Sequence, residues 1–120
     1  MIKTEKNYAP DAHYFNHLQP HLNWLMRGIL LNWLTEVCVD FMFKRDTYYL
    51  AVNYIDRYLS KKPGVKKWQL QLVGTTALYI AQKMEEVEPQ RVKQFSTATD
   101  DGYTVEQIKS MELTMLKVLP

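Results

Sequence analysis

The architecture of this 120-residue chain follows from one apolar segment, Met26-Arg27-Gly28-Ile29-Leu30-Leu31-Asn32-Trp33-Leu34. Read as a helix, the segment has more apolar residues than one buried face can take. At 100° per residue, the apolar positions fall on two arcs about a quarter turn apart. The first arc contains Met26, Ile29, Leu30, Trp33 and Val37, and the second contains Leu31, Leu34, Cys38 and Phe41. We expect the second arc to face the core and the first to form an exposed, shallow groove; the alternative, in which both arcs are core, is the more common outcome for such helices.

The charged residue of this segment requires a partner. Arg27 lies within the second arc, and a permanently charged guanidinium among apolar neighbours needs a carboxylate that points inward. Asp56 is the natural candidate, because it lies about 80° from Tyr48 on the next helix, at the edge of that helix's apolar arc. We therefore predict a buried Arg27–Asp56 ion pair. The alternative is an exposed Asp56 paired with Ser60 or water.

Composition restricts the classes of protein that fit. A chain of 120 residues with 47% apolar and 23% charged residues forms one domain with a proper core. The net charge of +2 comes from interspersed acids and bases, so no nucleic-acid partner is expected. The single cysteine, Cys38, fits a reducing compartment, and the apolar runs are too short to cross a bilayer. We expect an intracellular protein without a membrane partner.

Apolar periodicity and helix-stop signals predict an all-α domain. The expected helices cover about 10–19, 22–42, 47–61, 66–86, 91–97 and 104–119. The helix 66–86 is apolar nearly all round, which places it at the centre of the domain. Its small residues Gly74, Ala77 and Ala81 share one arc, where another helix can approach closely. The last helix begins with a capping box at Thr104 and Gln107.

Three carboxylates on the last part of the central helix and in the middle of the last helix call for cations. Glu85 and Glu86 end the central helix, where the macrodipole is negative. Glu112 falls within the apolar stripe of the last helix, about 40° from Ile108, where a carboxylate should be expelled or paired. Lys83 is the cation that could pair with it. The alternative is that Glu112 lies at the edge of the stripe and reaches water.

The sequence has no pattern that supports catalysis or a cofactor. His13, His17 and His21 recur every four residues, but Pro20 interrupts the helix that would stack them, so we expect no metal site. We find no nucleophile with a plausible base and no glycine-rich phosphate loop. We therefore expect a protein that is not an enzyme and needs no cofactor.

Several motifs, in order and at compatible spacings, resemble those of the cyclin box in A-type and E-type cyclins. They are the segment Met26 to Leu34 with its continuation Thr35-Glu36-Val37, Asn53-Tyr54-Ile55-Asp56-Arg57-Tyr58-Leu59, Leu70-Gln71-Leu72-Val73-Gly74, Ala81-Gln82-Lys83-Met84-Glu85-Glu86 and Met111-Glu112-Leu113. The resemblance implies a five-helix cyclin box over 22–120, the first repeat only, preceded by an N-terminal tail and additional helix over 1–21. Cyclins typically carry a second five-helix repeat, so this chain is expected to be either a fragment or a minimal one-box cyclin.

The chain departs from the family pattern at three places. Gly28 stands where the motif usually has alanine, Asn32 replaces an aspartate, and 87–90 lacks the family's aromatic, double-proline turn. The last departure puts kinase contacts at that turn in doubt.

The resemblance also implies a function. The chain would be a non-catalytic regulatory subunit, present in nucleus and cytoplasm, that binds and activates a cyclin-dependent kinase. Its kinase-binding residues would be Lys83, Glu85, Glu86 and Glu112, and the Arg27–Asp56 pair would hold two box helices together. The alternative from another class is a cyclin-box adaptor in transcription, which binds protein or DNA without activating a kinase; a basic surface would favour it, and the mixed charges do not supply one.

The family also recruits substrates and inhibitors through an exposed apolar patch that docks Arg-x-Leu motifs. By resemblance, this patch comprises Met26, Ile29, Leu30, Trp33 and Gln71, with Glu36 and Asp100 receiving the basic residue of the motif.

Overall fold

The computed structural model describes residues 18–119, which contain five helices and no strand. The helices are α2 (Trp24–Phe41), α3 (Arg45–Lys61), α4 (Lys67–Glu85), α5 (Val92–Ala98) and α6 (Val105–Val118). This arrangement confirms the all-α prediction, and the predicted boundaries differ from the observed ones by two residues or fewer. The additional helix expected at 10–19 lies almost entirely outside the described residues.

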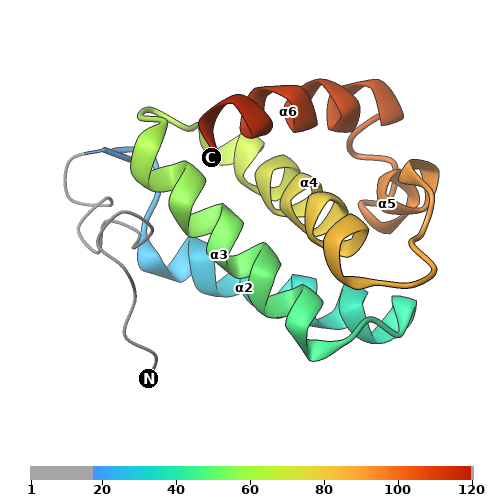
Figure 1. The fold of residues 1–120 in the computed structure, drawn as a ribbon. Coiled ribbons are helices and arrows are strands. Elements are labelled where there is room, and N and C mark those ends of the chain that lie inside the picture. The colour runs from blue at the N-terminus through green and yellow to red at the C-terminus, as the bar shows by residue number, and fades with distance from the viewer. Residues whose placement is uncertain (1–17, 120) are drawn as a thin grey trace.

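Helix α4 is the centre of the domain, as its all-round apolar pattern predicts. It packs against each of the other four helices, and Figure 1 shows it enclosed by α2, α3, α5 and α6. Eleven of its residues are buried, in an unbroken run from Leu72 to Leu78 with Leu70 before it and Ile80 to Gln82 after it. Between residues 18 and 119, no helix combines the length and apolar character needed to cross a membrane.

The core-facing surface of α2 differs from the predicted one. Its buried residues are Leu30, Leu34, Val37 and Cys38, which come from both predicted arcs. The spacing i, i+4, i+7 and i+8 describes one continuous stripe along the helix. The side of α2 that faces the core is therefore the strip where the two predicted arcs meet. Ile29, on the outer side of that stripe, is 63% exposed. The prediction that Leu30 and Val37 lie on an exposed arc is therefore wrong, although Ile29 of the same arc is exposed.

A buried glutamine ties the start of the described chain to the connection between α3 and α4. Gln19 is fully buried, and its amide nitrogen donates to the carbonyls of Leu59 (2.7 Å) and Lys62 (2.6 Å). Its amide oxygen accepts from Val65 N at 2.8 Å. Three satisfied hydrogen bonds offset the cost of burying the amide and fix the path of residues 62–65.

Two glycines provide a matched test of the packing between α2 and α4. A Cβ at Gly74 would lie 2.7 Å from Cδ1 of Leu30, whereas one at Gly28 would meet nothing within 4 Å. We expect Gly28→Ala to raise the free energy of unfolding by about 0.5–1 kcal/mol, because alanine is the better helix former. Gly74→Ala should fail to stabilise, since moving Leu30 costs about 1–3 kcal/mol. Chemical denaturation measures both changes.

The cause of this difference can be checked in a Leu30→Ala background. With the obstructing side chain removed, Gly74→Ala should stabilise by about the same amount as Gly28→Ala. If Gly74→Ala stabilises equally in both backgrounds, the two helices do not approach as closely as the structure shows.

Candidate functional site

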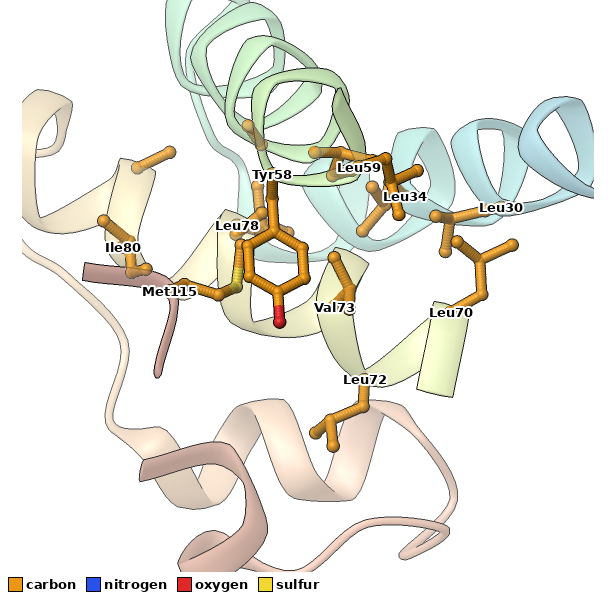
Figure 2. Packing of buried hydrophobic residues seen from close by; sticks show 14 of the residues in the cluster. Leu30, Leu34, Tyr58, Leu59, Leu70, Leu72, Val73, Leu78, Ile80 and Met115 are labelled. Atoms are coloured by element: carbon orange, nitrogen blue, oxygen red, sulfur yellow. The ribbon is translucent and has the colours of Figure 1, made fainter. Parts of the chain in front are cut away.

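An apolar groove of about 310 Å³ lies between α2 and the first turns of α4. Figure 2 shows Leu30 of α2 and Leu70 of α4 pointing toward one another at this junction. The lining residues are Met26, Ile29, Leu30, Trp33, Lys67, Leu70 and Gln71. Five of the seven residues that the resemblance assigned to the docking patch are therefore brought together: Met26, Ile29, Leu30, Trp33 and Gln71.

The groove differs from the predicted patch in its floor. Leu30 is only 5% exposed and lies at the bottom, beneath the exposed rim residue Ile29 and the partly exposed Trp33. Burial of Leu30 follows from its contact with Gly74, where the absence of a side chain on α4 leaves room. The other two residues assigned to the patch, Glu36 and Asp100, are exposed but are not among the residues that line the groove.

Sequence reasoning missed two lining residues, Lys67 and Leu70. Lys67 lies one helical turn before the other two, three residues before Leu70 and four residues before Gln71, so the three residues share one side of α4. The i, i+4 spacing between Lys67 and Gln71 was the signal that could have identified Lys67.

A second polar cluster lies at the other end of α4. Lys83 Nζ forms an ion pair with Glu112 Oε2 of α6, and it lies 4.4 Å from the centre of the Tyr79 ring. The Lys83 side chain is 41% exposed and that of Glu112 is 16% exposed. The Lys83–Glu112 ion pair, which the position of Glu112 within the apolar stripe of α6 predicts, is thus present.

Glu86, assigned to the same surface, is instead bonded to the start of α3. Its Oε2 accepts from Lys44 N at 2.7 Å and from the Thr47 hydroxyl. These groups are the backbone amide of the N-cap residue and the side-chain hydroxyl of the third residue of α3, so a carboxylate from the end of α4 ties that end to the start of α3. Glu85, at the last position of α4, is partly buried. The assignment of Glu85 and Glu86 to the kinase-binding surface stays a prediction.

The thiol of Cys38 lies in the same region of the core. Burial raises its pKa to about 11, and the negative charge of Glu86 adds to the increase. The thiol is therefore protonated at neutral pH and behaves as a small apolar side chain, as its position in α2 predicts.

Arg27 and Asp56 form the ion pair that joins α2 to α3. Arg27 Nε lies 2.9 Å from Oδ1 of the carboxylate, and Nη2 lies 2.7 Å from Oδ2. The side chains are 21% and 15% exposed, so the pair is half-buried where the sequence predicted a buried one. Ser60 donates to the backbone carbonyl of Asp56 at 2.7 Å.

The histidine pattern cannot be followed through the structure, because His13 and His17 lie outside the described residues. His21 Nε2 lies 3.4 Å from Lys66 Nζ. Within residues 18–119, no three His, Cys, Asp or Glu side chains are grouped so that they could hold a metal ion.

Comparison with known proteins identifies the family. The sequence profile of the cyclin N-terminal domain matches residues 1–120. The chain belongs to the cyclin family. It is 41% identical over 119 residues to the G1/S-specific cyclin-E1 of Rattus norvegicus, and 47% identical over 119 residues to cyclin-A2 of Xenopus laevis. Each alignment covers 99% of this cyclin, which spans only 29% and 28% of those two proteins.

A solved structure confirms the cyclin fold. The viral cyclin of herpesvirus saimiri superposes with a TM-score of 0.78 at 29% sequence identity, over 88% of this cyclin and 47% of the viral chain. The fold predicted from the sequence, a five-helix cyclin box, is therefore confirmed. The roles of individual site residues stay predictions.

Proposed function

We propose that this cyclin is a regulatory subunit that binds and activates a cyclin-dependent kinase and recruits substrates through the groove between α2 and α4. The observation that carries the proposal is that α4 contributes to two separate surfaces. Lys67, Leu70 and Gln71 line the groove at its start, and Lys83 pairs with Glu112 near its end. At about 1.5 Å per residue, Gln71 and Lys83 are about 18 Å apart along the helix. Kinase and substrate can therefore be held at the same time.

Kinase binding is supported by the Lys83–Glu112 pair, in which Lys83 is exposed and Glu112 is partly buried. Two charged groups that pair in the free chain have already lost part of their hydration. Each can therefore exchange its partner for a backbone group of a bound protein with little further desolvation cost. Affinity capture with this chain as bait tests the assignment. The wild type should retain a cyclin-dependent kinase that the Lys83→Ala/Glu112→Ala double variant does not; failure of the wild type to retain any such kinase would contradict the proposal.

Substrate recruitment is supported by the size and apolar lining of the groove. A leucine side chain buried there gains about 1.5–3 kcal/mol. One exposed charge contact, between Glu36 and the basic residue of an Arg-x-Leu peptide, adds at most about 1 kcal/mol. The sum is enough for weak and reversible recruitment but not for permanent assembly.

Trp33 provides the test of this groove. Trp33→Ala should weaken binding of an Arg-x-Leu peptide by about 2 kcal/mol or more, because tryptophans in such pockets carry a large share of the binding energy. Fluorescence anisotropy of a labelled peptide measures the loss. Kinase binding should be retained, since Trp33 lines only the groove.

Trp68→Ala is the matched control, because Trp68 is 60% exposed and does not line the groove. Its peptide affinity should equal that of the wild type. Equal peptide affinity of the Trp33→Ala variant and the wild type would show that the groove is not the docking site.

A further inference from the structure

A second groove lies at the corner where α2 ends and α3 begins, near the end of α4 (Figure 1). We call it the corner groove. Its volume is about 500 Å³, against about 310 Å³ for the groove between α2 and α4, and the two grooves share no lining residue. None of the residues assigned to kinase binding lines it either. Most of its lining is apolar or aromatic, from Val39, Met42, Phe43, Tyr48 and Tyr49.

The rim of the corner groove carries three apolar side chains that face solvent. Met42 is 87% exposed, Val39 is 70% exposed and Tyr49 is 59% exposed. Single exposed apolar residues are normal, but three that border one groove form a patch typical of binding surfaces. Phe43 is partly buried, and its ring packs edge-on against that of Phe41 at 5.3 Å between centroids. An ordered ring in the lining reduces the entropy lost on binding.

The backbone of Met42 is in a conformation that does not suit methionine. Its φ of 58° and ψ of 40° are left-handed, and its amide closes α2 by donating to Val39 O at 3.1 Å. Glycine is the usual residue at such a helix end, because a Cβ is strained there. Since the side chain of Met42 is almost fully exposed, packing within the domain does not offset the strain. A residue that conflicts with its backbone and projects into solvent is typical of a binding site.

The charged lining of the corner groove is entirely basic. Lys44 and Arg45 line it, both are exposed, and no acidic residue lines it. Neither side chain forms an ion pair with another of residues 18–119. Asp46 follows Arg45, and Glu86 contacts Lys44 N, but both carboxylates lie outside the lining. The N-terminus of α3 adds partial positive charge at the same place, so the groove favours an anionic ligand.

The apolar lining favours an aromatic side chain as the anchor of that ligand. Thioethers such as that of Met42 make favourable contacts with aromatic rings. The rings of Tyr48 and Tyr49 are edge to face at 5.6 Å between centroids, an arrangement to which a third ring can add.

We propose that the corner groove binds a short segment of a partner protein in which an aromatic residue stands beside aspartate or glutamate. The ring lies against Met42, and the carboxylate pairs with Arg45. The inference depends neither on kinase binding nor on Arg-x-Leu docking, because the residues that carry it belong to neither surface.

Random nonapeptides displayed on phage test this inference. They are selected on the immobilised wild-type chain after counter-selection on Met42→Gly, which keeps the groove between α2 and α4 and so removes peptides that bind there. The recovered peptides should contain phenylalanine, tyrosine or tryptophan with an acidic residue within about three positions, roughly 10 Å of extended chain.

Recovered peptides are then synthesised with a fluorescent label and their affinities are measured by anisotropy. Met42→Gly should bind them about fivefold or more weakly, because the thioether contact is lost. Its melting temperature should not fall, since glycine suits the left-handed backbone. Arg45→Gln should bind about two- to fivefold more weakly, as expected for an exposed ion pair, and the difference should shrink as salt is raised. The control Met84→Ala removes a methionine that is 69% exposed but lies outside the groove, and it should bind as the wild type does.

Several results would overturn the inference. They are the recovery of no peptide, the recovery of peptides without the aromatic and acidic residues, and wild-type affinity in Met42→Gly or Arg45→Gln. A dimer of the wild type in analytical ultracentrifugation that Met42→Gly converts to a monomer would assign the groove to a second copy of this chain. Loss of kinase binding in Met42→Gly would assign the groove to the kinase. Either of these two results would also contradict a separate peptide site.

Discussion

Replacing Lys83 or Glu112 by alanine is expected to weaken kinase binding by about 2–5 kcal/mol, the usual cost of removing one hydrogen-bonded charge from an interface. Each substitution also strands its former partner. The fold should be little affected, because the Lys83 side chain is 41% exposed and reaches water, while Glu112 retains 16% exposure; pairs with an exposed partner contribute about 0–1 kcal/mol to stability. Titration calorimetry against the purified kinase, together with melting curves, separates the two effects.

Lys62→Ala is the matched control for this prediction. It removes the same charge from an exposed lysine before α4, at the end of the helix opposite to Lys83. Kinase affinity should be retained. Unchanged affinity in both the Lys83 and the Glu112 variants would show that the kinase binds elsewhere.

Asp56→Ala is expected to destabilise the domain by about 3 kcal/mol, the lower end of the range for breaking a buried ion pair. The lower end applies because the two side chains retain 21% and 15% exposure. The substitution leaves the Arg27 guanidinium, which lies 5.4 Å from the centre of the Trp24 ring, without its bidentate partner between α2 and α3. Urea denaturation measures the loss, and kinase and peptide binding should decline only as the folded fraction declines.

Asp56→Asn refines the test, since an amide keeps the shape and one acceptor but not the charge. It should destabilise less than alanine does. An Asp56→Ala variant that unfolds at the wild-type urea concentration would refute a structural role for the pair.

The sequence allowed the helices and several contacts to be predicted because each left a local signal. An all-round apolar pattern placed α4 at the centre, and the capping box at Thr104 and Gln107 is present with hydrogen bonds of 2.8 and 3.1 Å. Charged residues within apolar stripes required partners, and one candidate was available for each. Arg27 is found with Asp56, and Glu112 is found with Lys83.

Features that depend on distant residues left no such signal. Glu86 bonds to the start of α3 from a position 42 residues after Lys44, and nothing near either residue indicates this contact. Gln19 is fully buried, although glutamine is usually exposed, because the connection between α3 and α4 offers three backbone partners. The depth of Leu30 depends on Gly74 in another helix. Helix periodicity alone cannot locate which part of a broad apolar face meets a neighbour.

The central claim, that this cyclin binds and activates a cyclin-dependent kinase, is tested most directly by a phosphorylation assay. Purified monomeric cyclin-dependent kinases are mixed singly with the wild-type chain or with the Lys83→Ala/Glu112→Ala variant, and phosphate transfer to a peptide without a docking motif is measured. We predict that the wild type accelerates transfer by at least one kinase and that the variant requires a much higher concentration for the same rate. If the wild type accelerates none of them, or the variant is as effective as the wild type, the account is contradicted.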